Sequence, residues 1–226
     1  MSDKTTLKLV IGNKAYSSWS LRGWLAAKQS GLHFEELIVP LFDEGWDERK
    51  REEDLAPSSG KVPILWDGEA VVWDSMAIVD YLADKVGRDR FWPKDNVARG
   101  MARAICAEML SAYLPLRREC PMNTRKTFPD ATVSEDARGD AIRILQLWAE
   151  ARSRFGQSGP YLFGTFSAAD IMFAPIVTRF VTYGFTLPGF AESYVKTIMA
   201  HHWMEEWYEA ATREDWVIQR IEDAGK

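Results

Sequence analysis

The first 86 residues alternate between strand-like and helix-like patterns, whereas everything after about residue 95 has helical periodicity alone. This change predicts two structural units, residues 1–86 and 95–226, joined by a linker at 87–94 that contains Gly87 and Pro93. With 226 residues, the chain exceeds a typical domain of about 100 to 150 residues but falls short of two full ones. We therefore expect one body with two lobes.

The first unit begins with the pattern of a βαβ unit, because a strand of alternating apolar residues is followed by a helix and a second strand. Further on, Asp67-Gly68 separates two short apolar runs, which is a strong hairpin signal. The expected elements are strands at Leu7 to Ile11 and Phe34 to Val39 around a helix at Leu21 to Gln29, one or two helical turns within Pro40 to Pro57, strands at Val62 to Trp66 and Ala70 to Trp73, and a helix after Asp74. This β-α-β-α-β-β-α order predicts an α/β domain of thioredoxin-like fold, with a mixed four-stranded sheet.

The second unit is predicted to be an all-α helical bundle. Its apolar residues recur at helical spacing from Met101 to Leu116 and from Ala137 to Phe155, which predicts two long amphipathic helices. A third helix is expected to begin at Phe166, because Ser167 and Asp170 have the spacing of a capping box. Shorter helices are expected near Ala191 to Met199 and Trp203 to Ala211.

Composition and charge exclude several classes of function. The net charge of −5 disfavours nucleic acid as a partner. No run approaches the roughly 20 apolar residues of a membrane span, and Met1 to Lys4 is followed by no apolar secretory core, so we expect a cytoplasmic protein away from the membrane. Cys106 and Cys120 lack CxxC spacing and the three histidines show no ligand pattern, so neither a disulfide nor a metal site is expected.

The segment from Tyr16 to Arg22 reads Tyr-Ser-Ser-Trp-Ser-Leu-Arg and connects the first strand to the helix that follows. It places serine hydroxyls at a helix N-terminus, where unpaired N–H groups and the positive end of the helix dipole favour an anion such as a thiolate or a carboxylate. The alternative is that one serine only caps the helix, since serine is a preferred N-cap residue. This segment is the first candidate site.

Together with three other motifs, this segment resembles the cytosolic glutathione transferases over nearly the whole chain. Lys61-Val62-Pro63-Ile64-Leu65 resembles the cis-proline segment of that family, Asp74-Ser75 its acidic-Ser motif, and Phe166 to Asp170 the capping box of its sixth helix. The likeness is closest to the zeta and other serine-type classes, whose Ser-Ser-Cys-Ser pattern becomes Ser17-Ser18-Trp19-Ser20 here. The resemblance implies glutathione as co-substrate, no metal, and a homodimer.

By this resemblance Ser17 is the catalytic serine, and Ser18 and Tyr16 are the next candidates. A thiol with a pKa of about 8.5 is largely protonated at neutral pH, so a hydrogen bond and a helix dipole that favour the thiolate raise the reactive fraction. Each unit by which the thiol pKa falls corresponds to about 1.4 kcal/mol. Ser17 is thus expected to donate a hydrogen bond to the glutathione sulfur without acting as a nucleophile.

The other motifs are expected to hold the rest of glutathione. Pro63, for which the resemblance implies a cis bond, turns the N–H and C=O of Val62 outward, where they can pair with the cysteinyl backbone. Asp74 and Ser75 begin a helix whose N-terminus can bind the γ-glutamyl carboxylate, while the acidic side chain holds its ammonium group. Lys61 is expected to attract the glycyl carboxylate.

The electrophile is expected against the first long helix of the second unit, where Met109, Tyr113 and Arg117 recur about one turn apart. The alternative for Met109 is a place in the core. Because residues 17–20 contain no cysteine, thiol–disulfide exchange is excluded. The predicted function is conjugation of glutathione to a small apolar electrophile. Two alternatives stay open, namely a glutathione-dependent isomerase of the maleylacetoacetate or maleylpyruvate type and a non-catalytic protein that binds glutathione or other ligands.

Overall fold

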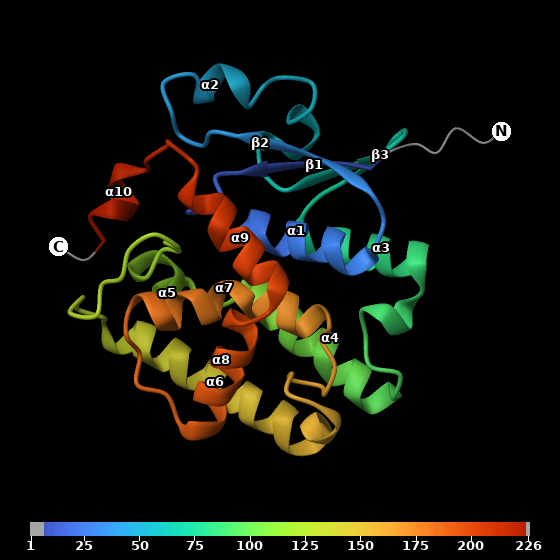
Figure 1. The fold of residues 1–226 in the computed structure, drawn as a ribbon, viewed down its shortest axis with the longest axis vertical. Coiled ribbons are helices and arrows are strands. Elements are labelled where there is room, and N and C mark those ends of the chain that lie inside the picture. The colour runs from blue at the N-terminus through green and yellow to red at the C-terminus, as the bar shows by residue number, and fades with distance from the viewer. Residues whose placement is uncertain (1–6, 225–226) are drawn as a thin grey trace.

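A four-stranded mixed sheet organises the first lobe, as the ribbon in Figure 1 shows. The computed structural model describes residues 7–224. The elements of this lobe are β1 (Leu7–Gly12), α1 (Ser18–Ser30), β2 (Phe34–Val39), α2 (Trp46–Arg49), β3 (Ile64–Asp67), β4 (Ala70–Val72) and α3 (Ser75–Val86). The strand order is β2-β1-β3-β4, with β1 and β2 parallel and β3 antiparallel to β1 and β4. The predicted thioredoxin-like fold is therefore confirmed.

Both faces of the sheet are covered by apolar side chains. Alternation along β1 sends Leu9 and Ile11 into the core that includes residues of α1 and α3, whereas Val10 packs into a second cluster on the opposite face. Figure 1 shows α1 and α3 on one side of the sheet and α2 on the other. The predicted hairpin joins β3 to β4, and Gly68 supplies the positive φ, 61°, that its turn requires.

The second lobe is helical, as predicted. Its helices are α4 (Asn96–Ser111), α5 (Leu114–Glu119), α6 (Glu135–Phe155), α7 (Ala168–Thr182), α8 (Gly189–Met199), α9 (His202–Thr212) and α10 (Gln219–Glu222). The capping box of α7 is present, because the Ser167 side chain accepts from the backbone N–H of Asp170 and Asp170 Oδ2 accepts from the Ser167 N–H at 2.9 Å. Helix α7 is buried along almost its whole length and packs against α1 and α4, so it joins the two lobes.

The structure corrects the prediction of one helix from Met101 to Leu116. Helix α4 ends at Ser111, Tyr113 has a positive φ of 62°, and α5 begins at Leu114. The reason is Pro115, which has no N–H for the carbonyl of Ser111 and whose ring would clash with that carbonyl in a continuous helix. Three smaller differences are that α1 begins at Ser18, three residues earlier than predicted, that β3 begins after Pro63, two residues later than predicted, and that the sequence patterns did not predict α10.

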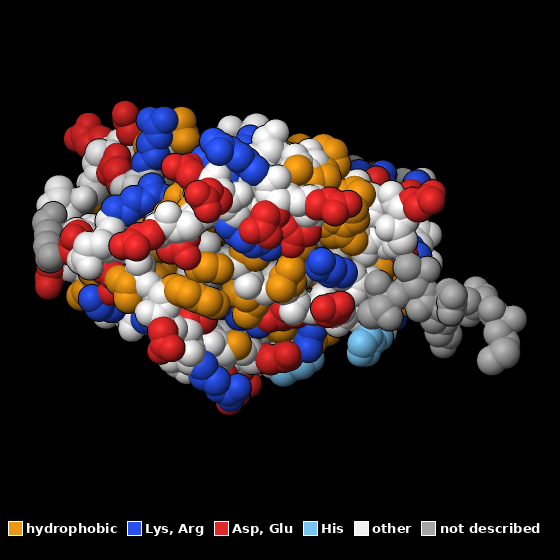
Figure 2. Space-filling view, turned by 90° about the horizontal axis from the view of Figure 1, so that it is seen from above, with side chains coloured by type: hydrophobic (Ala, Val, Ile, Leu, Met, Phe, Trp, Pro, Cys, Tyr) orange, Lys and Arg blue, Asp and Glu red, His pale blue; other side chains and the backbone are white. Residues whose placement is uncertain are grey.

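The surface mixes charge and apolar side chains. On the face that Figure 2 shows, acidic and basic side chains are interspersed, and hydrophobic side chains gather across the middle. Large hydrophobic side chains that are exposed include Phe42, Trp216 and Val217. Among residues 7–224, no helix combines the length and the apolar character needed to cross a bilayer.

Candidate functional site

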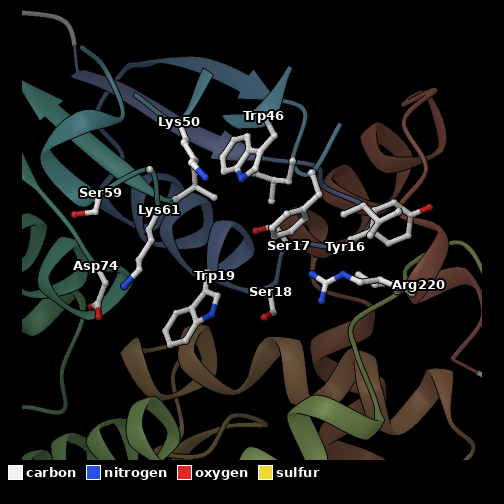
Figure 3. A pocket seen from close by; sticks show the side chains of 16 residues that line it. Tyr16, Ser17, Ser18, Trp19, Trp46, Lys50, Ser59, Lys61, Asp74 and Arg220 are labelled. Carbon is white, nitrogen blue, oxygen red and sulfur yellow. The ribbon is translucent and has the colours of Figure 1, made fainter. Parts of the chain in front are cut away.

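A cavity of about 640 Å³ lies between the first lobe and the C-terminal segment of the chain (Figure 3). Its walls come from the β1–α1 connection, the β2–α2 loop, the segment before β3, the start of α3 and the region of α10. Six of the predicted site residues line it: Tyr16, Ser17, Ser18, Lys61, Val62 and Asp74. The structure thus brings three motifs from distant parts of the sequence to one cavity.

Ser17 is the N-cap of α1 and one member of a serine pair. Its Oγ accepts a hydrogen bond from the Ser20 N–H at 3.3 Å and lies 2.8 Å from Ser20 Oγ. The Gly12 N–H donates to Ser20 Oγ at 2.9 Å, which fixes that hydroxyl against the end of β1. In the structure Ser17 donates this bond to Ser20. Because a hydroxyl both donates and accepts, rotation of the two hydroxyls lets Ser20 donate to Ser17 instead, which leaves the Ser17 proton for an anion in the cavity. The capping alternative and the functional one are therefore compatible.

Ser18 occupies the first turn of α1, beside Ser17. Its Oγ accepts a hydrogen bond from Arg179 Nη2 at 3.4 Å, so this hydroxyl faces α7 of the second lobe. Burial lowers the pKa of Arg179 to about 10, and the charge of Arg117 acts in the same direction. Ser18 therefore connects the helix N-terminus to a buried cation.

The Tyr16 hydroxyl is engaged with the C-terminal segment. It donates to Glu222 Oε1 at 2.8 Å, and Glu222 also accepts from Asn123 Nδ2 at 2.9 Å and pairs with Lys126 Nζ at 2.5 Å. Burial, followed by the bond to Glu222, raises the pKa of Tyr16 to about 12. In this arrangement Tyr16 anchors α10 over the cavity, and its proton is already committed to a carboxylate.

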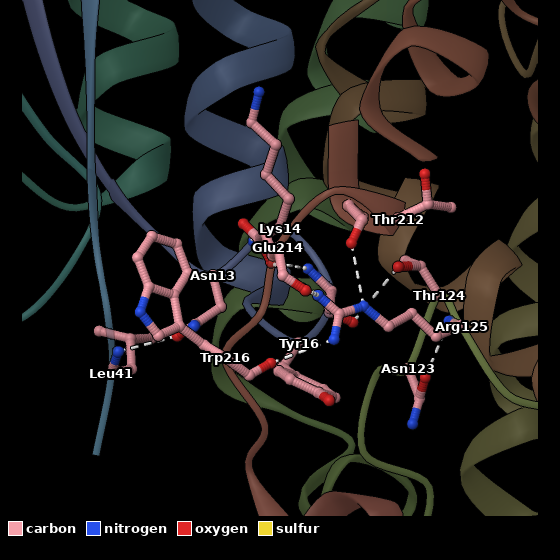
Figure 4. A network of polar contacts seen from close by, with 12 residues as sticks. Asn13, Lys14, Tyr16, Leu41, Asn123, Thr124, Arg125, Thr212, Glu214 and Trp216 are labelled. Carbon is pink, nitrogen blue, oxygen red and sulfur yellow. Dashed lines mark hydrogen bonds and ion pairs between the residues drawn. The ribbon is translucent and has the colours of Figure 1, made fainter. Parts of the chain in front are cut away.

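A second polar network holds the chain leading to α10, as Figure 4 shows. Glu214 accepts hydrogen bonds from the N–H groups of Lys14 at 2.6 Å and Ala15 at 3.0 Å. Arg125 donates to the carbonyls of Ala211 at 2.9 Å and Trp216 at 3.1 Å. The C-terminal segment is thereby attached to the loop that carries Ser17.

Of the five predicted glutathione-binding residues, Lys61, Val62 and Asp74 line the cavity, whereas Pro63 and Ser75 are not part of its lining. Figure 3 shows Lys61 and Asp74 side by side. The Val62–Pro63 bond is cis, as the resemblance implied. The N–H and C=O of Val62 pair with no residue in the part of the chain that the structure describes. Asp74 caps α3 by accepting from the Met76 N–H at 3.0 Å, and the buried Ser75 Oγ has no partner within residues 7–224.

The three predicted electrophile residues lie outside the lining of this cavity. Met109 is fully buried in the core, in agreement with the alternative stated for it. Tyr113 is also buried, and its hydroxyl donates to Glu108 Oε1 at 2.6 Å. Arg117 is the nearest to the cavity, because its guanidinium carbon lies 4.9 Å from the ring centroid of Trp19, which lines the cavity.

Sequence reasoning missed the apolar roof of the cavity and two buried cations beneath it. The roof consists of Leu41 and Phe42 from the β2–α2 loop, Trp46 at the start of α2, and Ile218 and Ile221 near the C-terminus. The cations are Arg22 and Arg179. A signal for Arg179 was present, because it is a charged residue inside a helix that is otherwise almost entirely apolar.

Among the described residues, no group of three or more His, Cys, Asp or Glu side chains is arranged to hold a metal ion.

Comparison with known proteins agrees with this two-lobed architecture. Residues 16–85 match the family model "Glutathione S-transferase, N-terminal domain", and residues 131–211 match "Glutathione S-transferase, C-terminal domain". Glutathione S-transferase 1 of Dianthus caryophyllus is 26% identical over 191 residues, which cover 80% of this chain and 81% of that protein.

Solved structures show the same fold. A glutathione transferase homolog from Burkholderia with bound glutathione has a TM-score of 0.69 and 22% identity, covering 92% of this chain and 100% of that one. Glutathione S-transferase unclassified 2 from Bombyx mori also has a TM-score of 0.69 and 22% identity, covering 98% of this chain and 97% of that one. A thioredoxin-like lobe and a helical lobe beside a common cavity define the class of protein. The chain belongs to the glutathione S-transferase family.

Proposed function

We propose that this protein is a glutathione transferase in which the Ser17 hydroxyl stabilises the glutathione thiolate for attack on a small electrophile. The observation that carries the proposal is the cavity, since it holds Ser17 at a helix N-terminus together with Val62 and Asp74. A short peptide that lies along this cavity meets a second helix N-terminus, an open backbone segment and a hydroxyl in turn.

The residues present fit glutathione. The unpaired N–H and C=O of Val62 suit the cysteinyl unit, because an extended peptide pairs with exposed backbone as an added strand does. The unpartnered Ser75 hydroxyl and the N-terminus of α3 suit the γ-glutamyl carboxylate, and the Asp74 side chain suits its ammonium group. Lys61 lies at the same end of the cavity and is offered to the glycyl carboxylate. In this pose the thiol is directed toward Ser17.

The chemistry then needs only a lower thiol pKa and a positioned acceptor. The thiol loses its proton to solvent, and the thiolate accepts a hydrogen bond from Ser17 while it lies near the positive end of α1. The sulfur lone pair forms a bond to the electrophilic carbon, and the leaving group departs with the electron pair of the bond that breaks. When the acceptor is an activated alkene, the electron pair moves to the adjacent carbon, which then takes a proton from water.

The test is the ionisation of bound glutathione, followed by ultraviolet absorbance of the thiolate. We expect the native protein to lower the thiol pKa by about 2 units, and Ser17→Ala to recover at least 1 of these, which is about 1.4 kcal/mol. Ser59→Ala, which removes a hydroxyl from another wall of the same cavity, is the matched control and should leave the thiol pKa unchanged. An unchanged thiol pKa in Ser17→Ala contradicts the role of Ser17, and failure of the native protein to bind millimolar glutathione contradicts the whole proposal.

Two alternatives use the same binding site. In glutathione-dependent isomerisation the thiolate adds to the substrate and leaves again, so product analysis distinguishes it from conjugation by the absence of a sulfur–carbon adduct. A non-catalytic binding protein would bind glutathione without turnover of any acceptor. Serine-dependent depression of the thiol pKa favours either enzyme over the binding protein.

A homodimer in the cytoplasm, which is typical of the family, is part of the proposal. The contact helices are then α3 and α4. Val97, near the start of α4, supports this assignment because it is an apolar side chain with 60% of its surface exposed. Light scattering should give twice the mass of one chain for the native protein and a lower mass for Val97→Glu.

A further inference from the structure

Three arginine side chains converge on the end of the cavity formed by Ser18 and Trp19. The guanidinium carbons of Arg22 and Arg117 lie 4.8 Å and 4.9 Å from the ring centroid of Trp19. Arg179 donates from Nη2 to Ser18 Oγ at 3.4 Å. Because Ser18 and Trp19 line the cavity, the three cations form a cluster directly behind one of its walls. Figure 3 shows the Ser18 and Trp19 side chains on the side of the cavity that faces the helices of the second lobe.

Among residues 7–224, no carboxylate forms an ion pair with an arginine of this cluster. The hydrogen bonds of its guanidinium groups go to neutral oxygens, namely the Met172 carbonyl for Arg22, the Leu110 and Ala112 carbonyls for Arg117, and the Cys120 and Pro175 carbonyls and the Ser18 hydroxyl for Arg179. Cations buried without a counter-ion are costly, so proteins seldom keep them without a use.

Two details indicate a ligand. Arg22 has only 1% of its surface exposed, and its Nη1 has no hydrogen-bond partner among the described residues. Burial lowers the pKa of Arg22, and the charges of Arg179 and Arg117 lower it further, whereas the more weakly acting charge of Asp74 raises it. A planar guanidinium group binds a carboxylate through two parallel hydrogen bonds, which makes carboxylate the anion that this donor set fits best.

Glutathione itself does not supply that anion in the proposed pose. Both of its carboxylates are assigned to Lys61 and the N-terminus of α3, which in Figure 3 lie on the other side of Trp19 from Ser18. What approaches Ser18 and Trp19 is the electrophile. The indole ring of Trp19 offers an apolar face to the body of such a molecule, and the arginines behind it offer positive charge to a carboxylate at its end.

We propose that Arg117 and Arg179, with Arg22 behind them, form a carboxylate-binding subsite that selects electrophiles carrying a carboxylate group. The inference rests on the proposed transferase function and narrows its substrate class from small apolar electrophiles to acidic ones. Arg117 and Arg179 act as specificity-determining residues, and Arg22 is a positioning residue, because it acts through Trp19 and through the field of the cluster.

The experiment compares two acceptors, 3-benzoylacrylate and its methyl ester, which differ in one negative charge. Because the ester is intrinsically more reactive toward thiolate, each kcat/KM is divided by the rate constant of the uncatalysed reaction with glutathione before the two are compared. We expect the native protein to prefer the acid by at least tenfold in kcat/KM. Arg117→Gln should lower kcat/KM for the acid by about 10- to 100-fold, because the carboxylate loses a charged hydrogen bond, and for the ester by less than threefold. Arg117→Lys, which keeps the charge but loses the planar fork, should fall between the two.

The control is Arg118→Gln, which removes the same charge from the next position of α5, where the side chain is exposed. It should leave both rates unchanged. Equal losses on acid and ester in Arg117→Gln overturn the inference, because they mean that the cluster acts on the thiolate alone. Absence of a preference in the native protein also overturns it, while turnover of the ester leaves the transferase function standing. If neither acceptor reacts and no thiolate forms, it is the proposed function that fails.

Discussion

Ser20 shows how much of the site depends on a residue that does not touch the substrate. Its Oγ accepts the Gly12 N–H at 2.9 Å and lies 2.8 Å from Ser17 Oγ, so it ties the end of β1 to the start of α1. Gly12 and Ser20 are both buried, so without the Ser20 hydroxyl the Gly12 N–H could not form a hydrogen bond with water instead. The contact between Ser20 Oγ and Ser17 Oγ therefore fixes the orientation of the Ser17 hydroxyl.

We predict that Ser20→Ala destabilises the protein and weakens thiol activation together. Loss of the acceptor for a buried N–H should lower the free energy of unfolding by about 1–3 kcal/mol. The loss of support for Ser17 should raise the thiol pKa by less than Ser17→Ala does. Urea unfolding and the thiolate absorbance measure the two effects. Ser153→Ala, at an exposed serine of α6, is the stability control, and a Ser20→Ala variant as stable as the native protein would contradict the assignment.

Helix α10 has only four residues and is stabilised by side-chain contacts rather than by its own length. Glu222 gathers hydrogen bonds from Tyr16 and Asn123 and an ion pair from Lys126. Because Ile218 and Ile221 line the cavity, these contacts determine how its apolar roof sits. Through its hydrogen bond to Glu222, Tyr16 thus helps to fix the position of α10.

We predict that Tyr16→Phe changes acceptor binding without changing the thiol. Removal of the hydroxyl leaves Glu222 with two partners and loosens α10, so KM for an apolar acceptor should rise about three- to tenfold. The thiol pKa should stay within about 0.3 units of the native value, because the Tyr16 proton is bound to Glu222. Steady-state kinetics and thiol titration on the same variant separate the two readouts. A large rise in the thiol pKa would instead assign Tyr16 as the thiol donor.

The start of α9 carries a pH-dependent contribution to stability. His201 is the N-cap, and its unprotonated Nδ1 accepts from the Trp203 N–H at 3.3 Å. Burial, followed by the charge of His202, lowers the pKa of His201 from 6.5 to about 4. The folded state therefore binds this proton less readily than the unfolded chain does, so the stabilisation is complete above pH 6.5 and is lost as the pH falls toward 4.

We predict that His201→Asn removes part of the acid sensitivity between pH 6.5 and 4. Asparagine can cap the helix but does not titrate. The fall in the free energy of unfolding between pH 6.5 and 4 should therefore be smaller in His201→Asn than in the native protein, by up to about 3 kcal/mol. Chemical denaturation at several pH values measures the slope. His33→Asn, at an exposed histidine in the loop before β2, serves as control, and identical slopes for native and His201→Asn would rule out this assignment.

At the scale of the whole molecule, short-range signals were predictable and long-range ones were not. The Asp67-Gly68 hairpin, the Asp74 cap and the Ser167–Asp170 box each depend on residues a few positions apart, so the sequence alone suffices to predict them. The Tyr16–Glu222 bond and the contact of Arg179 with Ser18 join residues more than 150 positions apart. Their partners depend on how α7 and the C-terminal segment pack against α1, which no local pattern specifies.

The contact between lobes leads to a prediction about unfolding. Trp207 of α9 is fully buried against Trp24 of α1, with ring centroids 5.3 Å apart, and its Nε1–H donates to the Lys14 carbonyl at 2.9 Å. Lys14 Nζ lies 5.2 Å from the centroids of both rings, which adds a cation–π contribution. Because Trp207 of the second lobe packs against Trp24 of the first, the hydrophobic core of each lobe is complete only when the other lobe is folded.

We therefore expect the two lobes to unfold in one transition, with coincident urea midpoints for far-ultraviolet circular dichroism and tryptophan fluorescence. Trp207→Ala should lower the free energy of unfolding by about 3–5 kcal/mol, because it leaves a large cavity at the contact and an unpaired Lys14 carbonyl. Trp216→Ala, at a tryptophan with 38% of its surface exposed, should cost much less. Separate midpoints in the native protein would mean that each lobe is stable on its own, and that the shared tryptophan pair positions the cavity without holding the fold together.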